Sequence, residues 1–270
     1  MILVNGVAAD SVAATDRGLA YGDGVFRTLL VSHGKPQCWS RHYRKLAQDC
    51  AALAMACPPK DVLASELALA AGATGDGVGK IIVTRGSGAR GYAPPQPSVP
   101  TRIVAVSASP QHPEAFLRSG VKVRLCRIRL SSQPRLAGVK HLNRLENVLA
   151  RAEWNDPSIA EGLLLDEEGH AISGTMTNLF IVEGGSVLTP RLSRCGVAGV
   201  TRERVMEAAA RQGMVCREDH LPWQRVLDAQ EVLLVNSVIG AWHVRECGNR
   251  RWEPGGFTGR VREWLDEKED

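Results

Sequence analysis

The segment between residues 80 and 97 restricts the fold more than any other stretch of the chain. The run KIIV at 80–83 is typical of a buried strand, and the sequence GSGARG at 86–91 follows it with the spacing G-x-G-x-x-G. In a dinucleotide-binding unit the last of these glycines opens a helix whose first amides contact the pyrophosphate. Here three prolines within residues 94–97 exclude a regular helix. The glycines therefore predict a flexible loop between two strands rather than a dinucleotide site.

Side chains on this loop are candidates for binding. The loop carries Arg85, Arg90 and Tyr92 and leads to a second predicted strand at 102–107. Loops held between rigid strands often present the groups that contact a ligand. We therefore expect this loop to have a binding role.

The composition allows a large core and argues against nucleic-acid binding. The chain has 270 residues, of which 44% are hydrophobic, enough for one large domain or two small ones. The net charge of +4 is mild, and the basic residues are scattered rather than gathered beside aromatic ones. An anionic small molecule is compatible with this charge.

The cysteines and the N-terminus indicate a cytoplasmic protein. Seven cysteines are dispersed without C-x-x-C or zinc-site spacing, which is typical of reduced thiols. The first residues, MILVNG, lack the features of a secretory signal, and no apolar run approaches the roughly 20 residues of a membrane span. The histidines form no helical pair, so we expect no metal and no membrane contact.

Hydrophobic periodicity predicts an α+β fold with two domains. Strands are expected at 2–4, 25–31, 80–85, 102–107, 121–128, 162–166, 178–183 and 230–236. Helices are expected from about residue 41, over 61–71, after Asn143, and over 201–212, where Gly213 ends the last one. The predicted domains are residues 1–108 and 121–270, joined by a linker at 109–120.

The predicted helix after Asn143 has a recognisable start. Asn143 is expected to be its N-cap, with Glu146 three residues later. Its apolar face would comprise Leu145, Val148, Leu149 and Ala152.

Three features could carry chemistry, and each also has an ordinary structural explanation. Lys140 lies at the end of the otherwise uncharged stretch LAGVK, where apolar neighbours favour a nucleophilic amine, but it could be a surface lysine. Gly199, Val200 and Thr201 begin a predicted helix whose free amides could bind a phosphate, or Thr201 could be a plain N-cap. Arg44 could be a solvated charge. Taken together, a nucleophilic lysine, a phosphate-binding helix N-terminus and an arginine are what pyridoxal phosphate requires.

The order of these motifs resembles a known family. The stretches DRGLAYGDGVFRTLLV, RHYRKL, TRGSGARGY, KHLNRLENVLA, TNLF, GVTRERV and VNS occur along the chain in the order seen in the fold type IV pyridoxal-phosphate enzymes. These include D-amino-acid and branched-chain aminotransferases and 4-amino-4-deoxychorismate lyases. The resemblance covers nearly the whole chain and implies the two-domain fold of that family, with the active site between the domains.

The resemblance implies roles for individual residues. Lys140 matches the family's Schiff-base lysine, and Phe26, Arg90 and Tyr92 match positions that contact the substrate, with the arginine and tyrosine holding its carboxylate from a loop at a dimer interface. The remaining cofactor contacts would come from Arg44, Val200, Thr201 and either Asn236 or Ser237.

One position departs from the family pattern. Members commonly have a glutamate five residues before the asparagine of N-L-F, where it pairs with the pyridine nitrogen of the cofactor. Ser173 occupies that position here, and a hydroxyl can only form a hydrogen bond. Alternatively, Glu167, Glu168 or a shifted register supplies the carboxylate.

The stretches RGSGARGY and AGVKHLNRLENVLA are most similar to the lyases of this family. The resemblance therefore implies a homodimeric enzyme that eliminates pyruvate from 4-amino-4-deoxychorismate and gives 4-aminobenzoate. An aminotransferase acting on D-amino or branched-chain amino acids is the nearest alternative, and a non-catalytic carrier of the cofactor is a more distant one.

Overall fold

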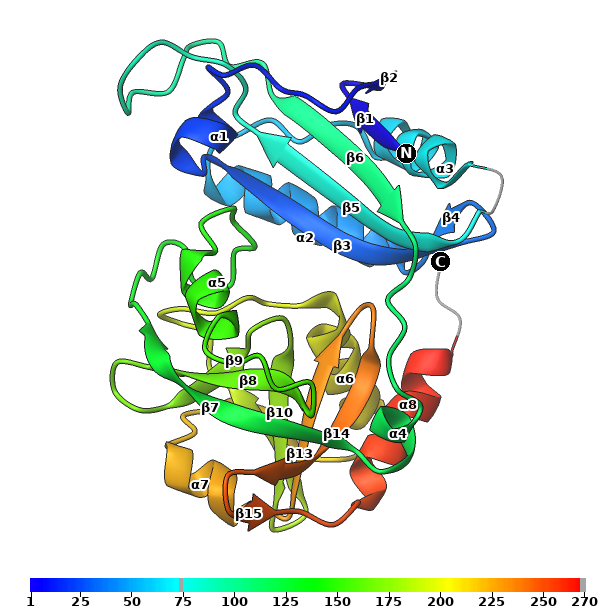
Figure 1. The fold of residues 1–270 in the computed structure, drawn as a ribbon, viewed down its shortest axis with the longest axis vertical. Coiled ribbons are helices and arrows are strands. Elements are labelled where there is room, and N and C mark those ends of the chain that lie inside the picture. Colours follow the sequence, from blue (N-terminus) through cyan, green and yellow to red (C-terminus); the bar gives the residue numbers. More distant parts are fainter. Residues whose placement is uncertain (73–74, 268–270) are drawn as a thin grey trace. The chain divides into compact units, whose positions relative to one another are not determined.

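The computed structural model describes residues 1–72 and 75–267, which form two compact units. The first unit comprises Met1–Pro110 and the short segment Val139–Asn143. The second comprises Gln111–Gly138 and the chain from Arg144 to the last helix. Figure 1 shows a smaller sheet with its helices in the first unit and a larger, strongly curved sheet in the second.

The first unit is a six-stranded sheet in the order β2-β1-β6-β5-β3-β4, with antiparallel pairing throughout. Its strands are β1 (Ile2–Val4), β2 (Val7–Ala8), β3 (Gly24–Ser32), β4 (Lys35–Pro36), β5 (Gly77–Thr84) and β6 (Thr101–Ser107). Its helices are α1 (Arg17–Tyr21), α2 (Trp39–Ala52) and α3 (Lys60–Ala71).

Alternation along β3 separates the core of this unit from the other face of its sheet. Val25, Leu29 and Val31 are buried in a cluster that also contains side chains of α2 and α3. Side chains alternate between the two faces of a strand, so Phe26 points to the opposite face, where it is half-buried. The glycine loop (residues 85–100) connects β5 to β6 and is the loop expected from the sequence.

The second unit contains nine strands, and six of them close into a ring. These are β10, β13, β14, β7, β8 and β9, and the ring closes where Ser173 of β9 pairs with Asn178 of β10. The strands are β7 (Val121–Leu130), β8 (Ile159–Asp166), β9 (Ala171–Gly174), β10 (Asn178–Glu183), β11 (Ser186–Pro190), β12 (Cys216–Asp219), β13 (Glu231–Asn236), β14 (Gly240–Cys247) and β15 (Arg250–Arg251). The helices are α4 (Ala115–Arg118), α5 (Leu145–Arg151), α6 (Val200–Arg211), α7 (Trp223–Asp228) and α8 (Gly256–Asp266).

Closure explains why β10 and β13 are apolar on both faces. Leu179 and Leu234 belong to one cluster together with Trp242 of β14, whereas Phe180 and Leu233 pack with side chains of α6 and α8. A strand covered on both sides needs a continuous apolar run rather than strict alternation. This arrangement confirms the predicted α+β class and the predicted strands at 178–183 and 230–236.

Three details differ from the sequence predictions. Arg144, not Asn143, is the N-cap of α5, and it makes no side-chain cap; Asn143 instead donates its side-chain amide to the Gly22 carbonyl at 3.4 Å. The linker contains the short helix α4, and the units divide after Pro110. Lys140 was expected in the C-terminal domain, but its segment groups with the first unit because it pairs with β3.

The predicted apolar face of α5 is exposed in the single chain. Leu145, Val148 and Leu149 are 75%, 59% and 58% exposed, and Ala150 is the buried residue of this helix. Large apolar side chains gathered on one short helix are uncommon on the surface of a monomer.

Candidate active site

Lys140 lies in the segment that extends the sheet of the first unit. Its carbonyl accepts a hydrogen bond from the Phe26 N–H at 2.9 Å, and Val25 forms a bridge with His141. The Lys140 Nζ atom lies 4.4 Å from the centre of the Phe26 ring, a cation–π distance. The structure therefore brings together two of the residues expected from the sequence, the lysine and Phe26.

A buried carboxylate contacts the main chain of this lysine. The Lys140 N–H bonds to the carboxylate of Asp49 on α2, which also pairs with Arg27. Burial raises the pKa of Asp49 above its usual value, although Arg27 and the Lys140 N–H act in the opposite direction. Neither Asp49 nor Arg27 was predicted from the sequence, where the one available signal was the charged residue at 27 within the apolar strand of residues 25–31.

A second lysine lies near the same ring. The Nζ atom of Lys80 on β5 is 5.4 Å from the centre of the Phe26 ring. Residues 26 and 82 are paired, so Lys80 shares the sheet face of Phe26.

The N-terminus of α6 gathers the polar groups that were expected to hold a phosphate. Gly199 is the N-cap and has no side chain to bond the first amides of the helix, while Val200 and Thr201 are buried at its start. The hydroxyls of Thr201 and Ser237 lie 3.1 Å apart. Free amides at a helix N-terminus together with paired hydroxyls form an anion site.

Close packing requires a glycine at the start of this helix. A Cβ atom on Gly199 would lie 2.2 Å from Oδ1 of Asn178, whose amide group donates to the Val197 carbonyl at 2.8 Å. Because Asn178 fixes the segment that leads into α6, it belongs to the construction of the site.

The two alternatives for the other phosphate contact differ in geometry. The Asn236 side chain bonds to main-chain groups: it donates to the Met176 carbonyl and accepts from the Val238 and Ile239 N–H groups. Ser237 directs its hydroxyl at Thr201. The arrangement favours Ser237.

Ser173 lies in the pair that closes the ring of strands and is 8% exposed. The carboxylates considered as substitutes lie elsewhere. Glu167 and Glu168 are exposed in the turn between β8 and β9, and Glu168 pairs with Arg194 at 2.5 Å. The Asp166, Glu168 and His170 side chains of this turn could together hold a metal ion.

Glu161 is a buried acid that was not predicted from the sequence. Its carboxylate accepts hydrogen bonds from the main-chain N–H groups of Gly162, Thr175 and Met176 and from the hydroxyls of Thr175 and Thr177. It therefore holds the turn between Ser173 and Asn178. The signal in the sequence was an acid at the start of the apolar run EGLLLD.

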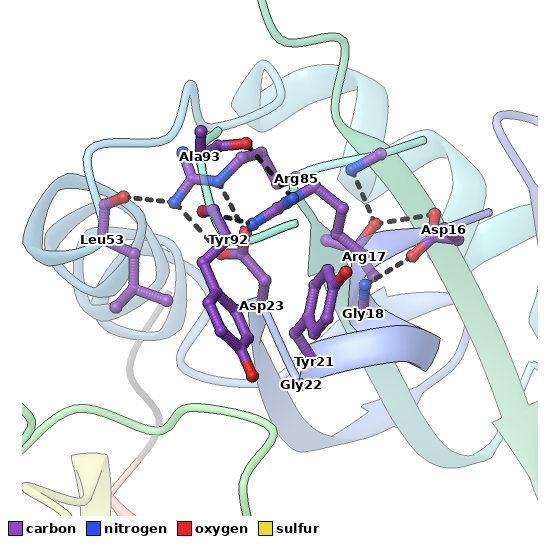
Figure 2. Close-up of polar contacts among 12 residues, drawn as sticks. Asp16, Arg17, Gly18, Tyr21, Gly22, Asp23, Leu53, Arg85, Tyr92 and Ala93 are labelled. Carbon is purple, nitrogen blue, oxygen red and sulfur yellow. Dashed lines mark hydrogen bonds and ion pairs between the residues drawn. The ribbon is translucent and has the colours of Figure 1, made fainter. Parts of the chain in front are cut away.

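The glycine loop presents two of its three predicted binding side chains to the outside. Arg90 is exposed, and Tyr92 is 85% exposed. Arg85 is 9% exposed; its guanidinium bonds to the Asp23 carboxylate and to the Leu53 carbonyl (Figure 2). It also bonds to the Ala54 carbonyl at 3.1 Å. Arg85 thus has a structural role.

The predicted residues are divided between the two units. Phe26, Arg44, Arg90, Tyr92 and Lys140 lie in the first unit, with Arg44 on the exposed side of α2. Ser173, Val200, Thr201, Asn236 and Ser237 lie in the second.

Among the residues that the structure describes, no helix is long and apolar enough to cross a membrane. All seven cysteines carry free thiols.

Known proteins with similar sequences include lyases and aminotransferases. The profile of amino-transferase class IV matches residues 24–247. Aminodeoxychorismate lyase of Vibrio harveyi is 36% identical over 242 residues, which is 89% of each chain. A putative branched-chain-amino-acid aminotransferase of Methanocaldococcus jannaschii is 30% identical over 260 residues, 92% of this chain and 88% of the relative.

Solved structures give the same result. The crystal structure of 4-amino-4-deoxychorismate lyase from Pseudomonas aeruginosa is 44% identical, covers 98% of both chains and superposes with a TM-score of 0.94. The Escherichia coli branched-chain amino acid aminotransferase has the same fold, with a TM-score of 0.87 at 21% identity over 100% of this chain and 96% of that one. The chain belongs to the amino-transferase class IV family.

Proposed function

We propose that the chain is a 4-amino-4-deoxychorismate lyase that releases pyruvate and 4-aminobenzoate. Its similarity to the Vibrio harveyi and Pseudomonas aeruginosa lyases supports this assignment. The observation that favours a lyase over an aminotransferase is Ser173, which stands where an acidic partner of the pyridine nitrogen is common in the family.

The residues of the chain fit pyridoxal phosphate, the cofactor of this family. The uncapped start of α6 and the hydroxyls of Thr201 and Ser237 suit its phosphate, with Val200 contributing a main-chain amide and Arg44 a charge. The half-buried Lys140 supplies the amine for its aldehyde.

When bound, pyridoxal phosphate withdraws electrons from the ring carbon that carries the substrate's amino group. Lys140 removes the proton from that carbon as the bond from the neighbouring carbon to the enolpyruvyl oxygen breaks. Lys140 can then return a proton to the departing group, which leaves as pyruvate. The remaining ring becomes aromatic, and this gain lessens the demand for a strongly electron-withdrawing cofactor. Ser173 is therefore easier to tolerate in this reaction than in amino transfer.

Arg90 and Tyr92 are the proposed contacts for a substrate carboxylate, and Phe26 packs beside the reacting amine. Arginine offers two parallel donors to a carboxylate, whereas a lysine ammonium offers a point charge. Arg90→Lys should therefore lower kcat/KM by roughly 2–4 kcal/mol in transition-state free energy. Kinetics within twofold of wild type would contradict the contact.

We also propose a cytoplasmic homodimer. The exposed Leu145, Val148 and Leu149 of α5 support a second copy as a partner, since their burial would remove an apolar surface from water. The free thiols fit a reducing compartment. Size-exclusion chromatography with light scattering should give twice the chain mass of 29.2 kDa, and a single-chain mass would contradict the dimer.

The function is tested with the purified holoenzyme and 4-amino-4-deoxychorismate. We expect fluorescent 4-aminobenzoate and pyruvate in equal amounts, and neither with Lys140→Ala. Parallel reactions with D-alanine or branched-chain amino acids and a 2-oxo acid measure amino transfer. Amino transfer without 4-aminobenzoate would replace the lyase assignment by the aminotransferase one.

A further inference from the structure

We propose that Arg17 is a positioning residue that holds the glycine loop in the conformation from which Arg90 contacts the substrate. This inference rests on the proposed function, because it assumes that Arg90 binds a substrate carboxylate. All of its parts lie in the first unit.

The Arg17 guanidinium binds three consecutive carbonyls of the loop. Its Nη1 atom lies 2.9 Å from the Gly91 oxygen and 3.4 Å from the Ala93 oxygen, and its Nη2 atom lies 3.0 Å from the Tyr92 oxygen. Arg17 is 3% exposed although it belongs to the short helix α1. Burial of a charged side chain needs this degree of hydrogen bonding.

A carboxylate fixes the direction of this guanidinium. Asp23 accepts from Nε of Arg17 at 2.9 Å and from Nε and Nη2 of Arg85 at 2.8 and 3.0 Å (Figure 2). Arg85 also binds the Leu53 carbonyl at 2.7 Å. The three charged side chains therefore form one network, in which Arg17 makes the hydrogen bonds to the loop carbonyls of residues 91–93.

The start of the loop is anchored to the same helix. The Arg17 N–H donates to the Gly86 carbonyl at 2.9 Å, and Asp16 forms a bridge with Ser87. A side chain at Gly86 is excluded there, because a Cβ atom would lie 1.9 Å from the Val99 carbonyl oxygen.

These two anchors leave only a short free span between them. Residues 86–87 are bound on one side and residues 91–93 on the other, so Arg90 adjoins the second anchor. The main-chain position of Arg90 therefore depends on the hydrogen bonds that Arg17 makes to the next three residues.

Tyr21 reinforces the second anchor. Its hydroxyl accepts from the Gly91 N–H at 3.2 Å, and its ring lies 5.4 Å from the Tyr92 ring. The Arg17 guanidinium carbon lies 4.9 Å from the centre of the Tyr21 ring. Figure 2 shows the two tyrosines side by side next to the arginine network.

The conservative variant Arg17→Lys separates charge from geometry. An ammonium can still pair with Asp23 but cannot reach a carboxylate and three carbonyls in one plane. The matched control is Arg102→Lys, since Arg102 lies in the same unit and pairs through Nε with Glu66 at 2.8 Å, away from residues 91–93.

The first measurement is limited trypsin digestion of each holoenzyme, with mass spectrometry locating the cuts. Cleavage after Arg90 should be about tenfold faster in Arg17→Lys than in wild type, because the released segment opens more often. Tyr21→Phe removes one contact and should give a smaller increase, which serves as a second variant if Arg17→Lys folds poorly. Arg102→Lys should match wild type. Unchanged cleavage after Arg90 in both Arg17→Lys and Tyr21→Phe would overturn the proposal.

The second measurement is steady-state kinetics with 4-amino-4-deoxychorismate. Arg17→Lys should raise KM about tenfold and change kcat by less than about twofold, with cofactor content unchanged, because the loop affects substrate binding. In an Arg90→Lys background, Arg17→Lys should raise KM by less than about a further twofold, since both substitutions act on the same substrate contact. Faster cleavage with a normal KM, or additive effects in the double variant, would overturn the positioning role.

The outcomes distinguish this proposal from the proposed function. A normal KM for Arg90→Lys would exclude the proposed contact between Arg90 and the substrate, whatever the digestion shows. A raised KM for Arg90→Lys together with a normal KM for Arg17→Lys would leave the contact in place and reject the role of Arg17.

Discussion

Replacing Glu161 with glutamine tests whether a single buried carboxylate organises the turn beside the proposed cofactor site. Oε1 of Glu161 accepts from the N–H groups of Gly162 and Thr175 at 2.9 and 3.1 Å. Oε2 accepts from the Met176 N–H and the Thr177 hydroxyl, both at 3.1 Å. Glu161 itself is fully buried, so water cannot substitute for a lost acceptor.

The amide of glutamine replaces one of these acceptors by a donor. If the NH₂ group takes the place of Oε2, the Met176 N–H loses its partner while the Thr177 hydroxyl can rotate to accept. If it takes the place of Oε1, two main-chain N–H groups lose their acceptor. The first orientation is therefore preferred, and one unsatisfied buried N–H costs about 1–3 kcal/mol.

Thermal unfolding of the holoenzyme measures the effect. For a chain of this size the loss corresponds to a fall in Tm of roughly 2–6 °C. Glu167→Gln is the matched control, since Glu167 is exposed in the turn between β8 and β9. The Tm of this variant should stay within about 1 °C of wild type. Because Met176 also accepts from Asn236, beside the proposed phosphate site, Glu161→Gln should lose cofactor faster on dialysis. A Tm indistinguishable from that of Glu167→Gln would refute the role given to Glu161.

Four further predictions concern single side chains. Lys140→Ala should abolish the covalent cofactor adduct trapped by borohydride, and an adduct on another lysine, found by peptide mass spectrometry, would contradict the assignment. Arg44→Ala should weaken cofactor retention by on the order of 1.5–3 kcal/mol, and retention as firm as wild type on dialysis would count against the phosphate contact. Ser173→Glu should increase pyridoxamine phosphate formed per pyruvate released, and an unchanged ratio would remove support for the role of the serine. Burial raises the pKa of Asp23, but the bonds to Arg85 and Arg17 outweigh this effect and lower the pKa overall. The contribution of Asp23 to stability is therefore present above about pH 4 and is lost as pH falls through the folded-state pKa. Asp23→Asn should flatten the acid limb of a curve of unfolding free energy against pH, and an unchanged limb would contradict this.

Local patterns predicted the elements that are covered by another layer on one face only. In β3 the alternation of Val25, Leu29 and Val31 with residues of the other face is visible in the sequence, because only one face meets the helices. The helix over 61–71 and the end of α6 at Gly213, with φ of 69°, were likewise predicted from spacing and from the need for a left-handed residue. The resemblance supplied the candidate lysine and phosphate site, which the local pattern had left open.

The groups that the sequence did not reveal are buried polar ones. Glu161, Asp49 and Arg17 look like ordinary surface charges in a one-dimensional pattern, since the partners of each include main-chain groups that are not its neighbours in the sequence. The carbonyls bound by Arg17 lie 74 to 76 residues away along the chain. Such partners depend on the tertiary fold, and no local periodicity encodes them.

The segment around Lys140 shows why the domain boundaries could not be drawn along the chain. Gly138 pairs with Val197 and accepts from the Ala198 N–H, and so belongs to the unit that contains α6. Two residues later the Lys140 carbonyl accepts from Phe26, in the other unit. A chain that exchanges hydrogen-bonding partners within three residues has little freedom to shift its register. Lys140 is therefore held by β3 within the first unit, whereas Gly138, whose φ of 81° disfavours a side chain, is held by the segment that leads to α6 within the second.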